Sequence, residues 1–84
     1  MEAETQPEVT FTVSCIDAAE CTVHFEPDGA FHVLRADDEF RVDITRGTLP
    51  LHIEIAYHPG GISIVEASDA EVRVRNRDGV ELPI

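Results

Sequence analysis

Lysine and tryptophan are absent from this chain of 84 residues, and all six of its basic side chains are arginines. Against 17 acidic residues they leave a formal net charge of −11. Binding to a nucleic-acid backbone or to an anionic membrane surface depends on clustered lysine and arginine. We therefore expect no direct nucleic-acid or membrane ligand. The imbalance is typical of an arginine-preferring or salt-adapted bacterial host, or of an acidic surface that meets a basic protein partner.

Long apolar runs are also missing. No run approaches the roughly 18 residues that span a bilayer. The chain opens with MEAETQPE, which is acidic where a secretory signal begins basic and continues apolar. These features predict a cytoplasmic protein in which residues 1–7 form a disordered acidic tail and residues 8–84 form a single β domain. A domain of this length buries only roughly 60% of the surface that its unfolded chain exposes, so its core is thin.

Helical periodicity is the third absence, since no segment keeps a 3.6-residue apolar repeat over three turns. Apolar and polar residues instead alternate in short runs bounded by turn residues, which is typical of half-buried strands. The runs predict about eight strands, at residues 8–15, 21–26, 30–36, 40–45, 51–58, 62–65, 71–75 and 80–84. Such spacing indicates an all-β fold, either an antiparallel β-sandwich or a small closed barrel.

The best-defined local structure is a hairpin within CTVHFEPDGAFHVLRA, residues 21–36. Pro27, Asp28 and Gly29 favour a three-residue loop, because proline suits the second turn position and glycine the left-handed one. Counting outward then pairs His24 with His32 across the strands. One face becomes apolar, with Cys21, Val23, Phe25, Phe31 and Val33. The other face is polar apart from Leu34.

Cys15 and Cys21 are the only cysteines, and both lie in phase with the apolar residues of their strands. Both side chains should therefore point into the core, where the two thiols could face each other at disulfide range. Since no secretory signal is evident, we expect buried free thiols, with a disulfide as the alternative.

Candidate metal ligands occur at two places in the sequence. His24 and His32 are predicted cross-strand neighbours, but zinc takes at least three protein ligands. Asp37, Asp38 and Glu39 are adjacent acids that could contribute to a calcium site, although EF-hand spacing is absent. We expect solvated side chains and no cofactor, with a metal- or small-ligand-binding domain as an alternative function.

Catalytic signatures are lacking too. Ser14, Ser63 and Ser68 stand in no nucleophile motif, and neither cysteine has a neighbouring cation that would lower its pKa. The glycines form no phosphate-binding loop. The sequence therefore predicts a protein that is not an enzyme.

The leading interpretation is a small acidic module that acts through its surface, as a protein-interaction or accessory protein or by self-association. Arg73, Arg75 and Arg77 alternate along one predicted strand and its turn, and form the only basic row in an acidic chain. We expect this row to contact an acidic or self-complementary surface. An acidic inhibitor that mimics nucleic acid is a second alternative, because it accounts for the small size and the charge.

Overall fold

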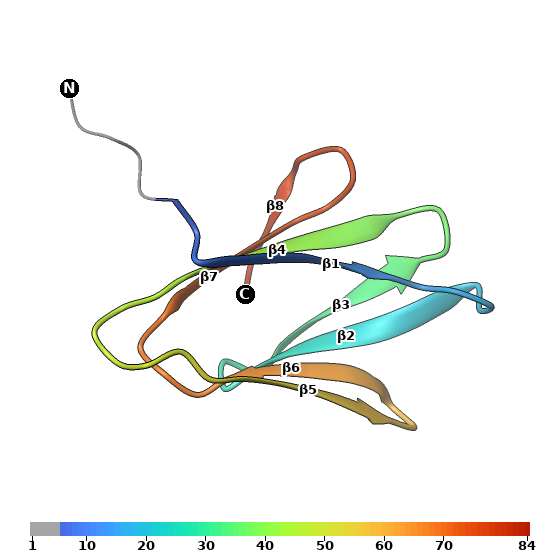
Figure 1. Ribbon diagram of the computed structural model, residues 1–84. Helices are drawn as coiled ribbons and strands as arrows, with labels where there is room; N and C mark the ends of the chain where they lie inside the picture. Colours follow the sequence, from blue (N-terminus) through green and yellow to red (C-terminus); the bar gives the residue numbers. More distant parts are fainter. Residues whose placement is uncertain (1–5) are drawn as a thin grey trace.

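The computed structural model describes residues 6–84, which form eight strands and contain no helix (Figure 1). Residues 1–5, the larger part of the expected tail, lie outside the described residues, and Gln6 and Pro7 precede the first strand without regular structure. The strands are β1 (Val9–Ser14), β2 (Glu20–Glu26), β3 (Ala30–Arg35), β4 (Glu39–Thr45), β5 (Ile53–His58), β6 (Gly61–Glu66), β7 (Glu71–Arg75) and β8 (Glu81–Leu82). Each begins and ends within a few residues of its predicted position.

The strands form two four-stranded sheets that pack face to face. One sheet has the order β1-β4-β7-β8, and the other has the order β3-β2-β6-β5. Neighbouring strands are antiparallel except β2 and β6, which are parallel. Neither sheet closes on itself within residues 6–84. Of the two predicted folds, the structure is therefore the β-sandwich and not the closed barrel.

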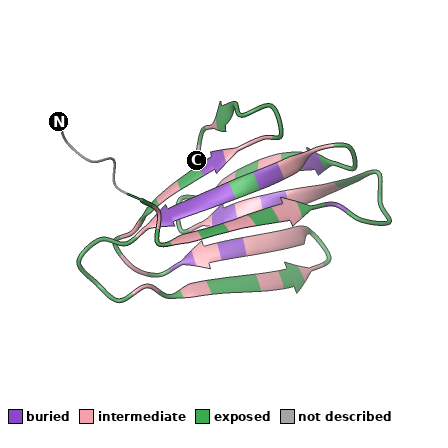
Figure 2. Ribbon diagram, turned by 45° about the horizontal axis from the view of Figure 1, so that its top comes forward, coloured by how far each residue is buried: buried purple, intermediate pink, exposed green. Residues whose placement is uncertain are grey.

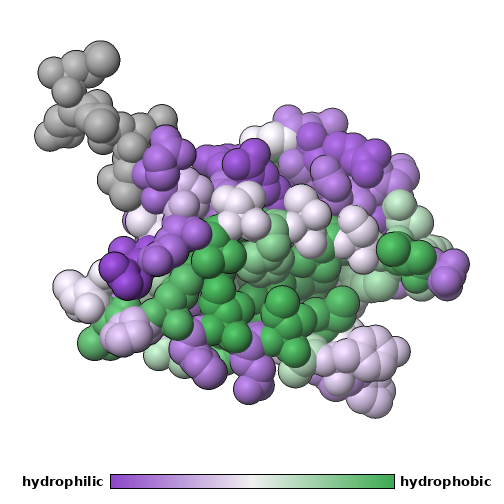
Figure 3. All heavy atoms as spheres, viewed as in Figure 1, coloured by the Kyte–Doolittle hydropathy of each residue, from purple (hydrophilic) through white to green (hydrophobic). Residues whose placement is uncertain are grey.

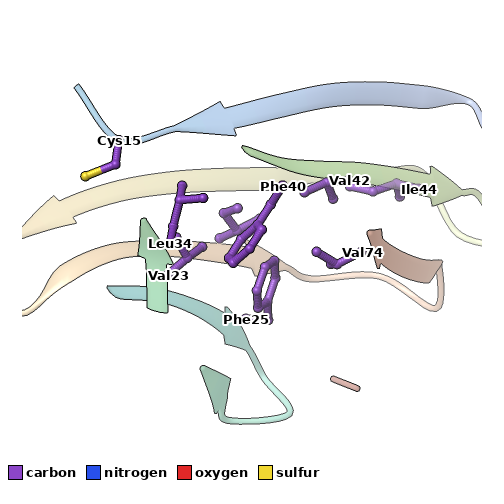
Figure 4. Close-up of a cluster of buried hydrophobic side chains, with 9 residues drawn as sticks. Cys15, Val23, Phe25, Leu34, Phe40, Val42, Ile44 and Val74 are labelled. Carbon is purple, nitrogen blue, oxygen red and sulfur yellow. The ribbon is translucent and has the colours of Figure 1, made fainter. Parts of the chain in front are cut away.

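The core lies between the two sheets and is made mostly by alternate side chains of the central strands (Figure 4). Its buried members are Cys15, Val23, Phe25, Leu34, Phe40, Val42, Ile44, Ile64 and Val74. Odd-numbered residues face inward on β2, as the alternation predicts. Figure 2 shows how burial is concentrated in the middle of each sheet, whereas no residue of the edge strand β5 is buried.

The β2–β3 register differs from the prediction by one residue. Phe25 pairs with Ala30, and Gly29 donates its backbone N–H to the Phe25 carbonyl at 3.0 Å, so the loop contains four residues instead of three. His24 consequently pairs with Phe31 and not with His32. A shift of one residue turns every side chain of a strand to the opposite face. Leu34 is therefore in the core, and Phe31 and Val33 face solvent.

Cys15 and Cys21 form a disulfide, with 5.9 Å between their Cα atoms. The expectation of free thiols was therefore wrong, whereas their predicted inward orientation was right for Cys15, which is buried. The bond joins the residue that follows β1 in one sheet to β2 in the other sheet. It is a covalent link between the two layers of the sandwich.

The observed register predicts opposite responses to two alanine substitutions on β3. Leu34→Ala should lower the free energy of unfolding by about 2–5 kcal/mol, because it leaves a cavity in the core. Phe31→Ala should cost less than about 1 kcal/mol, because 62% of this residue is already exposed. Urea denaturation of both variants measures the difference. If Phe31→Ala were the more destabilising change, the observed register would be contradicted and the three-residue loop would be favoured.

Reduction of the disulfide should also destabilise the fold. Because six positions separate the two cysteines, loop-closure entropy gives a loss of about 2 kcal/mol. Urea denaturation with and without a phosphine reductant measures it, and a Cys15→Ala/Cys21→Ala variant, which should not respond to reductant, is the control. Two titratable thiols in the unreduced protein would contradict the bond.

Candidate functional site

The outward face of the β1-β4-β7-β8 sheet carries two members of the predicted arginine row. Arg73 and Arg75 both lie there, but each is close to acidic side chains of the same sheet. The Nη1 atom of Arg75 lies 3.0 Å from Oδ2 of Asp43, and the Nε atom of Arg73 lies 2.8 Å from Oε1 of Glu71. Arg77 lies in the β7–β8 turn, where its backbone N–H donates to Asp38. The row is thus largely neutralised within its own sheet.

Asp43 is the centre of this polar face. It is 9% exposed and accepts hydrogen bonds from the Thr10 hydroxyl at 2.8 Å and from Nε of Arg41 at 3.2 Å, in addition to Arg75. Burial pushes the pKa of Asp43 upward, but these two hydrogen bonds and the positive charges of Arg41 and Arg75 outweigh burial and hold its pKa below the usual 3.8. A shallow cleft of about 460 Å³ lies over this network. The carboxylate at the centre of this face is therefore already paired with donors of its own sheet.

The predicted metal ligands are not brought together. His24 faces outward, whereas His32 faces inward and lies 2.6 Å from the Pro83 carbonyl oxygen through its Nε2 atom. Asp38 uses one carboxylate oxygen to accept the backbone N–H groups of Glu39 and Arg77, so it caps two turns. Asp37 is exposed at this turn. In the part of the chain that the structure describes, no three His, Cys, Asp or Glu side chains are grouped to hold a metal ion.

A histidine and serine contact on the other sheet was missed by the sequence reasoning. Nε2 of His58 lies 2.7 Å from the Ser63 hydroxyl, and the His24 and His58 rings are 5.4 Å apart. Gly60 donates its N–H to Nδ1 of His58, so a neutral His58 carries its proton on Nε2 and donates it to Ser63. A general base would need a lone pair there, so this arrangement does not activate the serine. Counting the β5–β6 hairpin outward from Gly60 would have found the contact.

The inner face of β5 points to the same side as the core, but the opposite sheet does not cover it. Ile55 pairs with Ile64 and Tyr57 with Ile62, so all four side chains lie on the inner face of their sheet. Ile64 is buried, yet Ile55 is 61% exposed and Tyr57 is 88% exposed. The two sheets are therefore offset. The β1-β4-β7-β8 sheet ends at β1, and no described strand covers the inner face of β5.

The edge strand β1 borders the same uncovered region. The Ile44 carbonyl faces β1, because it accepts the backbone N–H of Glu8 at 2.8 Å, and the residue opposite Ile44 is Val9. By alternation the N–H groups of Phe11 and Val13 also face β4, whereas those of Thr10 and Thr12 point away from it. The side chains of Phe11 and Val13 are only partly buried against the core. Figure 3 shows the result as a continuous apolar band between β1 and β5. We call this region the open edge; it comprises Phe11 and Val13 of β1 and Ile53, Ile55 and Tyr57 of β5.

Comparisons with known proteins found no matching family, no similar curated protein and no similar solved structure. Among residues 6–84 there is no helix long and apolar enough to cross a bilayer. The fold and its surface define a two-layered β-sandwich with a satisfied polar face and one uncovered apolar edge.

The Asp43 network predicts a specific pH dependence of stability. Asp43→Asn should lower the free energy of unfolding by about 1–3 kcal/mol at pH 7, because charge-assisted hydrogen bonds are lost. Since the pKa of Asp43 is lower in the folded than in the unfolded protein, its ionised form stabilises the fold above about pH 4, and this contribution is lost as the pH falls through the folded value. The difference between wild type and variant should therefore shrink below pH 4.

Urea denaturation between pH 2 and pH 7 measures this difference, with exposed Asp37→Asn as the control. A wild-type advantage over Asp43→Asn that stays constant across this range would contradict the assignment.

Proposed function

We propose that this protein is a non-catalytic interaction domain whose open edge receives an extended strand of a basic partner protein. The observation that carries the proposal is the exposure of Ile55 and Tyr57 on a face aligned with the core. Monomeric soluble proteins rarely leave a large contiguous apolar patch uncovered, and such patches are typical of interaction sites.

The added strand would pair with β1. The outward N–H groups of Thr10 and Thr12 are positioned for a new ladder, which would make the partner the fifth strand of the β1-β4-β7-β8 sheet. A strand in this position lies over the inner face of β5. Because strand side chains alternate, every second side chain of the partner would cover Ile55 and Tyr57, so the partner segment should alternate apolar and polar residues.

Charge favours a basic partner over a second copy of this chain. Arg41, Arg46, Arg73 and Arg75 already form ion pairs with acidic side chains of the same molecule. The remaining excess of acids gives the chain its formal charge of −11. A second copy carries the same charge and is repelled, whereas a basic segment is attracted and steered toward the surface. The arginine row is thus not the contact that we propose, because Arg73 and Arg75 lie close to acidic groups of their own sheet.

The other predicted functions stay predictions, since no contact in the structure favours nucleic-acid mimicry or metal binding. A cytoplasmic location also stays a prediction. The Cys15–Cys21 bond favours oxidising surroundings instead, because such bonds are rare where thiols are kept reduced.

A nine-residue peptide in which valine and lysine alternate is the probe for the open edge. On binding, the amides of Thr10 and Thr12 should exchange at least about tenfold more slowly, while those of Phe11 and Val13, which already face β4, should change little. An Ile55→Ser/Tyr57→Ser variant should bind the peptide at least about tenfold more weakly, because apolar burial is lost. Val80→Ser is the control, since Val80 is similarly exposed but lies in the β7–β8 turn.

Three outcomes would overturn the proposal. The Ile55→Ser/Tyr57→Ser variant could bind the peptide as well as wild type. A peptide with glutamate in place of lysine could bind equally well, which would remove the charge argument. Sedimentation could show that the chain alone dimerises through the open edge, which would make a second copy the occupant.

A further inference from the structure

A second apolar cleft lies at one end of the sandwich, and none of its lining residues belongs to the open edge. It has a volume of about 240 Å³ and lies where the β2–β3 turn and the β6–β7 connection meet, at the same end of the molecule in Figure 1. Its apolar lining consists of Phe25, Ile44, Ile64, Ala70, Val72 and Ile84. This lining comes from both sheets, so the cleft is an opening into the core.

The polar group inside this cleft is the carboxylate of Glu66. Glu66 pairs with Ile53 on the inner face of β6 and is only 8% exposed. Its Oε1 atom accepts the backbone N–H of Ser68 at 2.5 Å and also the Ser68 hydroxyl. Both of these hydrogen bonds from Ser68 go to Oε1 of Glu66. The other carboxylate oxygen, Oε2, takes part in neither of them.

The charges around the cleft have one sign. Glu26 and Asp28 also line it, and its lining includes no arginine. A carboxylate in an apolar site is stabilised by a paired cation that also forms hydrogen bonds. Residues 6–84 place no cation in the lining, so the cation that fits this site comes from outside the described residues.

We propose that this cleft binds a primary ammonium group on a short apolar stem, with the ammonium on Glu66 and the stem against Phe25 and Val72. The volume equals about eight water molecules at about 30 Å³ each, so the ligand is small. The ammonium group donates to the oxygen that Ser68 leaves unused. The same chemistry is offered by a free amine and by a lysine side chain of a protein. The site shares no residue with the open edge, so it stands independently of strand docking.

Benzylamine is the probe, with benzyl alcohol and benzoate as neutral and anionic ligands of similar shape. Amide shifts in heteronuclear NMR titrations should move at Ser68, Ala70 and Ile84 with benzylamine, and at least about tenfold more weakly with the other two. Glu66→Gln keeps an acceptor for Ser68 and should raise the dissociation constant of benzylamine at least about tenfold. Glu26→Gln, at the edge of the cleft, should change this constant by less than about threefold. Ala70→Leu fills the cleft and should abolish binding.

A lysine residue blocked at both ends separates the two sources of the ammonium group. Tighter binding of this compound than of benzylamine supports a protein side chain as the ligand, and the reverse order supports a free amine. Equal binding of benzylamine and benzyl alcohol, undiminished binding to Glu66→Gln, or no shift up to about 50 mM of either amine overturns the proposal. Ile55→Ser/Tyr57→Ser should leave benzylamine binding unchanged, so this result does not depend on the open edge.

Discussion

Each sheet of a β-sandwich has to cover the inner face of the other, and here the two sheets are offset so that the inner face of β5 is left uncovered. β2 and β6 are covered, and their inward residues Val23, Phe25 and Ile64 are buried. β5 extends beyond the last strand of the opposite sheet, so Ile55 and Tyr57 have the orientation of core residues but the exposure of surface residues. The offset determines where the core ends and where a partner could extend it.

Two-residue alternation was sufficient to predict the strands and the all-β class, because each strand is half-buried. It failed on β3 for an identifiable reason. The segment Phe31, His32, Val33 and Leu34 has apolar residues on both faces, so its pattern does not select one register. The prediction then depended on the length of the turn, and Pro27, Asp28 and Gly29 are compatible with three or four loop residues. The one additional residue in the loop explains why Phe31 is exposed and Leu34 is buried.

The candidate sites were harder to predict than the strands, since they depend on pairs far apart in the sequence. Arg73 and Arg75 were correctly assigned to one face of a strand, but Asp43 reaches Arg75 only because β4 pairs with β7. The open edge depends on how the two sheets stack, which alternation within a strand does not encode. Glu66 follows the strand predicted at residues 62–65, and a carboxylate at the end of a short strand gives no sign in the sequence that it faces inward.

The disulfide connects the stability of the fold to the proposed docking strand. β1 has one sheet neighbour, β4, and its opposite edge is the one that would accept a partner. The bond between Cys15 and Cys21 ties the end of β1 to β2 in the other layer. An edge strand held on one side only opens locally more easily than a central strand, and opening removes the ladder that a partner needs. Oxidation therefore supports both the layer contact and the geometry of the accepting edge, so conditions that reduce the bond should weaken docking before they unfold the core.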